Sequence, residues 1–177
     1  MPVELRRAKP PDADFLLELF ADDDVRPFLR PRGAATREEV LEGIERSLAE
    51  PGSFGRFVVE LDGERAGALG FHAVNERHRI ARLEQLAIHP RFRGRRLGDD
   101  AARLFQRLLL EELGFHRLEL EIYAFNERAC VHAERAGYTR EGRKRKAYRK
   151  DGEWVDSVLY AIVAEDLDRP GWIGEAP

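Results

Sequence analysis

Two Asp-Gly pairs, Asp62-Gly63 and Asp151-Gly152, restrict most strongly how this chain can fold. Each pair stands between apolar runs, and an Asp-Gly pair readily adopts the positive φ angles of a two-residue turn. The first pair predicts a hairpin between a strand ending at Leu61 and a strand over 66–74. The second predicts a hairpin whose last strand covers 155–163. Antiparallel neighbours are therefore expected at two places in the sheet.

Four other stretches repeat apolar residues at helical spacing and separate the remaining strands. The elements then follow the order β-α-α-β-β-β-α-β-α-β-β, in which both hairpins and helices connect the strands. We expect an α+β fold with a mixed central sheet flanked by helices. The expected helices cover about residues 12–21, 36–50, 98–113 and 126–136, and the strands outside the hairpins cover about 3–8, 80–88 and 118–123.

Length and composition indicate one domain. Of the 177 residues 43% are hydrophobic, which is enough for one sizeable core. We expect a single domain over 1–168 and a loose tail over 169–177. Lys and Arg number 30 against 33 Asp and Glu, so the net charge is −3, and this balance disfavours a globally basic nucleic-acid binder.

The sequence also indicates the cellular compartment and argues against a metal site. Cys130 is the single cysteine, so the chain forms no internal disulfide and offers no cysteine cluster for zinc, as is usual in the reducing cytosol. Residues 1–6 lack the order of a signal peptide, and no apolar run approaches the roughly 18 residues that cross a bilayer. The acidic run 22–24 is interpreted as a solvated helix end. We expect a cytoplasmic protein without metal or membrane.

A turn rich in glycine and arginine follows the strand that ends at Ile88. The first N–H groups of a helix have no intrahelical acceptor, and the helix dipole is positive there. Backbone donors of residues 94–99 would therefore hold a diphosphate, and four arginines between 91 and 96 add positive charge. On composition alone a solvated turn is an equally good interpretation. The Walker pattern and the Gly-x-Gly-x-x-Gly pattern are both missing from the sequence.

The stretch Arg91-Phe92-Arg93-Gly94-Arg95-Arg96 resembles the acetyl-coenzyme A loop of the GCN5-related N-acetyltransferases, whose pattern is Gln/Arg-x-x-Gly-x-Gly/Ala. Arg96 departs from that pattern, which has Gly or Ala at this position. The segments 126–129, 134–138 and 151–160 resemble the branch of the family that acetylates the N-terminal alanine or serine of ribosomal proteins. The resemblance covers most of residues 80 to 166.

The resemblance implies that the chain moves an acetyl group from acetyl-coenzyme A to a primary amine. A protein N-terminus, a polyamine, an amino acid or an antibiotic amine would each serve as acceptor, and a homodimer is a further expectation from the family. The residues expected to contact the coenzyme are Leu86, Ala87 and Ile88 on the strand, Arg93, Gly94, Arg95, Arg96, Leu97, Gly98 and Asp99 at the turn, and Asn126 and Ala129 at the next helix.

The groups that move protons are harder to assign. Many relatives carry a tyrosine acid seven residues after the asparagine, but Ala133 stands at this position. Glu84 is our first choice for a base acting through water, with Tyr148 as an auxiliary acid. His72 is either a base or a structural histidine. A covalent role for Cys130 is disfavoured, because no histidine is placed by sequence to activate it.

A different class of function is also considered. The basic clusters 91–96 and 143–146 would attract phosphate whatever the base sequence, as in an RNA- or ribosome-associated binding module without catalysis. The negative net charge and the shortage of aromatic residues among these cations weigh against nucleic acid. The acidic run 22–24 would favour a polycationic acceptor if it lay near the acceptor site.

Overall fold

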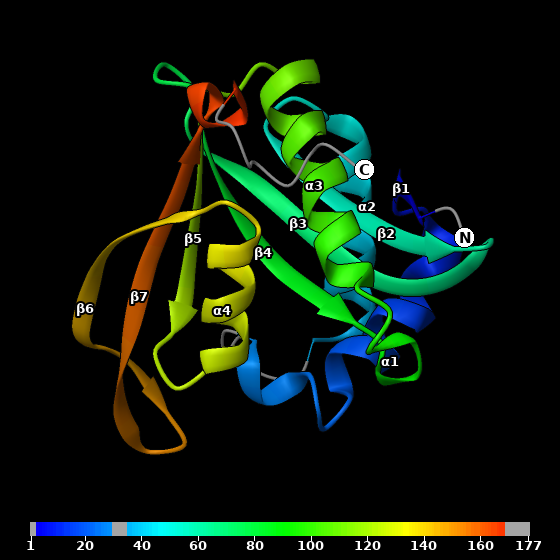
Figure 1. The fold of residues 1–177 in the computed structure, drawn as a ribbon. Helices are drawn as coiled ribbons and strands as arrows, with labels where there is room; N and C mark the ends of the chain where they lie inside the picture. Colours follow the sequence, from blue (N-terminus) through cyan, green and yellow to red (C-terminus); the bar gives the residue numbers. More distant parts are fainter. Residues whose placement is uncertain (1–2, 30–34, 169–177) are drawn as a thin grey trace.

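The computed structural model describes residues 3–29 and 35–168. The tail 169–177, expected to be loose, lies outside the described residues. Seven strands form one sheet in the order β1-β2-β3-β4-β5-β7-β6 (Figure 1). Every neighbouring pair is antiparallel except β4 and β5, which are parallel. The strands are β1 (Val3–Arg7), β2 (Phe54–Leu61), β3 (Glu64–Asn75), β4 (Ile80–Ile88), β5 (Arg117–Tyr123), β6 (Thr139–Lys150) and β7 (Glu153–Val163).

Helices cover both faces of this sheet (Figure 1). The helices α3 (Leu97–Arg107) and α4 (Glu127–Arg135) pack on one face, and α1 (Ala13–Ala21) and α2 (Arg37–Ala49) pack on the other. Phe105 of α3 meets Phe57 and Phe71 of the sheet at 5.2 and 6.1 Å between ring centroids, in edge-on contacts that suit aromatic pairs. The shorter helical turns are η1 (Pro10–Asp12), η2 (Arg26–Phe28), η3 (Pro90–Phe92), η4 (Leu108–Glu112) and η5 (Ala164–Asp168).

The expected fold class and element order are confirmed by the structure. The helix expected over 98–113 is interrupted, because regular α-helix ends at Arg107 and a π-type turn over Leu108–Glu112 follows. Apolar spacing could not reveal this change, since Leu109 and Leu110 are both buried across the turn. No helix within the described residues is long and apolar enough to cross a membrane.

The strands β4 and β5 pair over only three residues each. Their ladder runs from Ile80 opposite Arg117 to Arg82 opposite Glu119 and then stops. Beyond these pairs the two strands diverge toward their C-terminal ends (Figure 1). We call the space bounded by the unpaired parts of β4 and β5 the opening. It gives this mixed sheet two free backbone edges in its middle, where an extended ligand can form hydrogen bonds.

A bulge in β4 lies beside the opening. Glu84 stands opposite Gly70 and Ala87 stands opposite Ala68, so β4 has one residue more than β3 between these pairs. Gln85 lies in this bulge and has a φ of 60°, which is uncommon for a residue other than glycine. The bulge keeps Glu84 and Ala87 on the same face of the sheet, the face that packs against α1 and α2.

Candidate coenzyme and acceptor site

The N-terminus of α3 lies just beyond the C-terminal end of β4. Between them, Phe92 of η3 is buried and anchors the turn, while Gly94 has a φ of +80°. Arg96 follows in the left-handed conformation, with φ 56° and ψ 13°, and the helix begins at Leu97. This arrangement leaves the first N–H groups of α3 at the mouth of the opening, as expected for a diphosphate site.

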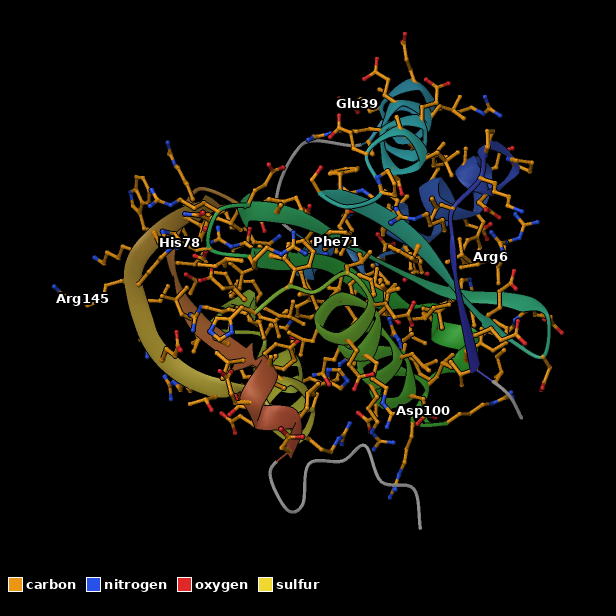
Figure 2. All side chains as sticks on the ribbon, turned by 90° about the horizontal axis from the view of Figure 1, so that it is seen from above. Arg6, Glu39, Phe71, His78, Asp100 and Arg145 are labelled. Atoms are coloured by element: carbon orange, nitrogen blue, oxygen red, sulfur yellow. The ribbon has the colours of Figure 1, made fainter. Side chains whose placement is uncertain are left out.

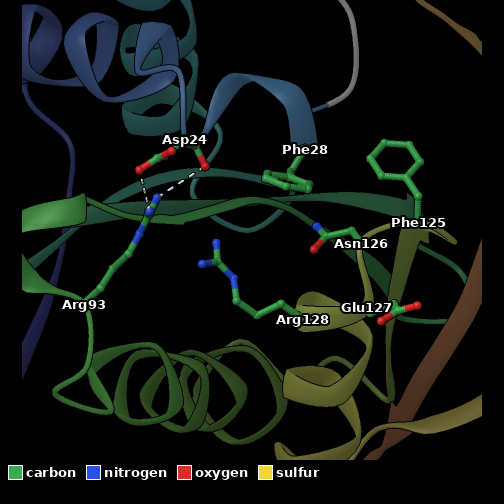
Figure 3. Close-up of a pocket in the computed structure, with 7 residues that line it drawn as sticks. All are labelled: Asp24, Phe28, Arg93, Phe125, Asn126, Glu127 and Arg128. Carbon is green, nitrogen blue, oxygen red and sulfur yellow. Dashed lines mark hydrogen bonds and ion pairs between the residues drawn. The ribbon is translucent and has the colours of Figure 1, made fainter.

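The arginines of this turn differ in their partners and in their exposure. Arg91 forms an ion pair with Glu64 at 2.7 Å. Arg93 forms one with Asp24 at 3.1 Å and also donates to the backbone oxygen of Asp24 (Figure 3). Arg93 therefore connects the turn 91–96, which we call the coenzyme turn after its expected role, to the segment after α1. Arg95 and Arg96 are both exposed.

A pocket of about 390 Å³ lies next to this turn (Figure 3). Its lining brings together three distant parts of the chain: the segment around η2, the coenzyme turn and the start of α4. Asn126 lines it and also caps α4, since its side-chain oxygen accepts a hydrogen bond from the N–H of Ala129 at 3.2 Å. The lining residues are Asp24, Phe28, Arg93, Phe125, Asn126, Glu127 and Arg128.

The three strand residues expected to contact the coenzyme border the opening. Ala87 and Ile88 pair with β3 on one side. Their other side faces the opening, since β4 has no ladder with β5 after Arg82. Leu86 follows the bulge and is 40% exposed. Contact of these three residues with the coenzyme stays a prediction of the sequence analysis.

Arg96 allows a direct test of the turn geometry. A residue with a side chain costs roughly 1–2 kcal/mol in the left-handed conformation, a cost that glycine does not have. We expect Arg96→Gly to leave the free energy of unfolding unchanged or to raise it by up to about 1 kcal/mol, with the affinity for acetyl-coenzyme A within a few-fold. Urea unfolding and calorimetric titration would measure both. A tenfold loss of affinity would instead show that the guanidinium binds the coenzyme.

Glu84 does not lie alone on its strand. Its Oε1 is 3.0 Å from Nδ1 of His72 and 3.3 Å from Nη1 of Arg56. Burial acts to raise the pKa of Glu84, but the hydrogen bond from His72 and the charge of Arg56 outweigh it and lower the pKa to about 2. At neutral pH such a carboxylate is a weak proton acceptor, which works against the base role expected from the sequence.

The partners of Tyr148 and His72 were not predictable from spacing alone. Tyr148 donates a hydrogen bond to Oε1 of Glu121 at 2.8 Å, so its proton is engaged by a carboxylate. His72 is bonded to Glu84 rather than solitary. Ala133, at the position of the missing tyrosine, is 1% exposed and packs in the core with α3.

The sequence analysis missed Glu121. Alternation along 118–123 places it on the face opposite Leu118 and Leu120, where charged residues normally meet solvent. Its side chain is instead 1% exposed, covered by residues of β6 and β7. A buried carboxylate that interacts with neighbouring strands leaves no signal in local sequence.

All three residues of the acidic run 22–24 form a hydrogen bond or an ion pair. Asp22 accepts a hydrogen bond from the N–H of Asp24, Asp23 pairs with Arg26, and Asp24 pairs with Arg93. Within the described parts of the chain, no group of three or more His, Cys, Asp or Glu residues could hold a metal ion.

These features agree with the comparison to known families. A family model for the acetyltransferase (GNAT) domain matches residues 3–139. The chain belongs to the GNAT acetyltransferase family. The resemblance drawn from the coenzyme turn and the C-terminal segments is thereby confirmed at the level of the family.

Two relatives indicate where in the GNAT family the chain lies. The spermidine N(1)-acetyltransferase of Escherichia coli (strain K12) is 31% identical over 107 residues, which are 60% of this chain and 57% of that protein. The match thus spans a little over half of that relative. A proposed ribosomal N-acetyltransferase of Bacillus subtilis (strain 168), YdaF, is 26% identical over 180 residues, covering 98% of this chain and 94% of the relative.

Solved GNAT structures share the fold of the whole chain. A spermidine N-acetyltransferase from Vibrio cholerae in complex with coenzyme A and spermine superposes with a TM-score of 0.84 at 20% identity, covering 93% of this chain and 96% of that one. A ribosomal L7/L12 N-acetyltransferase in complex with coenzyme A gives 0.81 at 19% identity, covering 91% and 93%. At these identities the likeness shows the fold alone.

Proposed function

We propose that this GNAT protein transfers an acetyl group from acetyl-coenzyme A to a primary amine. The observation that carries the proposal is the opening between β4 and β5, which ends at the N-terminal turn of α3. A diphosphate at residues 94–99 places the rest of the coenzyme along Leu86, Ala87 and Ile88, inside the opening. Asn126 lines the neighbouring pocket and is bonded to the N–H of Ala129.

The reaction then needs mainly proximity. The amine nitrogen attacks the thioester carbon, a C–N bond forms, and the C–S bond breaks. The ammonium proton leaves to solvent, and the coenzyme thiolate takes a proton from water. The N–H of Ile88 is our candidate for stabilising the carbonyl oxygen as negative charge develops, because the neighbouring His89 N–H donates to Ala66 of β3 and alternation turns the N–H of Ile88 away from β3. Because Glu84 is a weak base, we propose that the amine is deprotonated before it reacts, with rate enhancement from positioning.

The charges around the acceptor side favour an amine on a neutral or acidic molecule over a polyamine. Seven of the twelve residues of β6 are Lys or Arg, of which Arg143 pairs with Asp156 and Lys144 with Glu121. Arg145 lies on the outer side of this strand (Figure 2), and it is exposed together with Lys146. In the acidic run 22–24, Asp24 lines the pocket but is paired with Arg93, and Asp23 is paired with Arg26. We therefore favour a protein N-terminus as acceptor, because these cations repel a polycation.

A panel of amines tests the function and the acceptor together. Free thiol release would be followed with spermidine and with peptides that carry a free N-terminus followed by acidic or by basic residues. We expect kcat/KM for the acidic peptide to exceed that for spermidine by about tenfold or more at low salt, and the difference to shrink as salt screens the cations. A preference for spermidine would contradict this choice of acceptor.

The cations of β6 also favour a second candidate, the binding module without catalysis. It requires RNA binding that is tight and falls steeply with salt, together with no affinity for acetyl-coenzyme A. Filter binding with RNA and calorimetry with the coenzyme separate the two functions. A cytoplasmic location and a homodimer stay predictions of the sequence analysis.

A further inference from the structure

Glu121 is a buried carboxylate held by groups from two other strands. Its side chain is 1% exposed. Oε1 accepts hydrogen bonds from Tyr148 Oη at 2.8 Å and Ser157 Oγ at 2.7 Å, and Oε2 pairs with Lys144 Nζ at 3.1 Å. Apolar residues of similar volume often stabilise a core as well as such a buried charged cluster does. The effect of Glu121 on its hydrogen-bond partners is therefore more informative about its role than its contribution to stability.

The first consequence concerns the hydroxyl of Tyr148. A phenol carries one hydrogen, and here that hydrogen is donated to a carboxylate. The oxygen of Tyr148 can then act toward a ligand only as a hydrogen-bond acceptor. A hydrogen bond to an ionised partner also polarises the hydroxyl and makes its oxygen a better acceptor. This orientation suits a ligand that donates N–H groups and does not suit a general acid.

The second consequence is the position of this pair beside the opening. The last paired residues of the two strands are Arg82 and Glu119. Two residues further along the same face of each strand come Glu84 on β4 and Glu121 on β5. Glu121 as a residue is partly exposed although its side chain is not, so its accessible part is main chain at the unpaired edge of β5. The Tyr148 hydroxyl therefore reaches the strand that borders the opening, across from Glu84.

A row of contacting aromatic rings connects Tyr148 with the pocket. Tyr148 meets Tyr123 edge-on with centroids 5.7 Å apart, and Tyr123 stacks on Phe125 at 5.2 Å. Phe125 lines the pocket beside Asn126 (Figure 3). One wall of the acceptor side is thus formed by aromatic rings, with Lys150 over the ring of Tyr123 and the Tyr148 oxygen oriented by Glu121, a combination that admits an amine and fixes its N–H direction.

We propose that Tyr148, oriented by Glu121, accepts a hydrogen bond from the acceptor amine and so determines the direction of its nitrogen lone pair toward the acetyl group. This inference rests on the proposed function and names a binding group for the same site. Tyr148 contacts the amine, and Glu121 is a positioning residue that acts through Tyr148.

Steady-state kinetics of Tyr148→Phe test the proposal with the best amine of the panel. Losing a hydrogen bond to the amine should raise KM for the amine by about tenfold or more while kcat stays within about threefold. A general acid would instead lose about 10²- to 10⁴-fold in kcat at unchanged KM. Tyr160→Phe is the matched control, because Tyr160 also donates to a carboxylate, Glu134 at 3.0 Å, but on the α3 and α4 side of the sheet. It should leave KM for the amine unchanged.

Glu121→Gln, alone and combined with Tyr148→Phe, tests the positioning role. If Glu121 acts through Tyr148, Glu121→Gln raises KM in the wild-type background and changes it by less than about twofold in the Tyr148→Phe background. Three results would each overturn the inference. The first is a KM in the double variant raised by the product of the two single effects, the second is an unchanged KM in Tyr148→Phe, and the third is a kcat loss typical of a general acid. A wild-type protein that binds acetyl-coenzyme A but acetylates no amine would overturn the proposed function, and this inference with it.

Discussion

Gly94→Val should weaken acetyl-coenzyme A binding by about 10- to 100-fold, which corresponds to about 1.4 to 2.8 kcal/mol. Gly94 has a φ of +80°, and a β-branched residue in such a conformation is strained by roughly 1–3 kcal/mol. The turn would shift to relieve this strain and move its N–H donors away from the diphosphate. Among the residues that the structure describes, apart from the two chain neighbours, no atom lies within 4 Å of an added Cβ, so the side chain would project into space that the coenzyme is proposed to use. Calorimetric titration measures the effect.

Gly152→Val supplies a closely matched control for the change at Gly94. Gly152 has a φ of +87°, and among the described residues outside its chain neighbours a Cβ added there also meets no atom within 4 Å. It lies in the hairpin between β6 and β7, whereas the hairpin between β2 and β3 contacts the coenzyme turn through Glu64 and Arg91. Both variants should lose similar stability in thermal unfolding, but only Gly94→Val should lose coenzyme affinity. Equal losses of affinity in the two folded variants would remove residues 94–99 as the diphosphate site.

The hairpins and the helix order were predictable because local chemistry determines them. Asp62-Gly63 and Asp151-Gly152 both have positive φ angles, as the turns required. Thr36 and Glu39 form the reciprocal capping bonds that their spacing indicated. In such cases the residues that decide the structure are neighbours in sequence. The coenzyme turn belongs to this group, since strand, glycine and helix start follow each other directly.

The proton-moving groups were not predictable in the same way. Their properties depend on partners from other strands, as with Glu84, which is 28 positions from Arg56, and Tyr148, which is 27 positions from Glu121. The opening itself depends on where the β4 and β5 ladder stops, and no local pattern marks Arg82 as its last residue. The sequence therefore named Glu84 and Tyr148 without their partners, and their catalytic roles stay predictions.

Glu84→Gln should reduce stability strongly and kcat only modestly. The ion pair with Arg56 holds side chains that are 29% and 17% exposed, so the variant leaves a largely buried guanidinium without this carboxylate. The pKa of Glu84 is lowered from 4.5 to about 2, which amounts to about 3 kcal/mol of folding free energy at neutral pH. Because the folded-state pKa is the lower one, this stabilisation is present above pH 4.5 and is lost as the pH falls toward 2. Urea unfolding at pH 7, 5 and 3 should show a weaker pH dependence in the variant than in the wild type.

The kinetic half of this prediction distinguishes two mechanisms. If the amine arrives already neutral, Glu84→Gln lowers kcat by less than about tenfold, and the rate of both proteins rises with the titration of the amine itself. If Glu84 accepts the proton through water despite its low pKa, kcat falls by about 10²- to 10⁴-fold while coenzyme affinity is retained. Glu119→Gln is the matched control, because Glu119 is also an ion-paired carboxylate on the same face, held by Arg82 and Arg117, and its pKa is also lowered. It should reproduce the direction of the stability change without altering kcat, so that a large kcat loss confined to Glu84→Gln would restore Glu84 as the base.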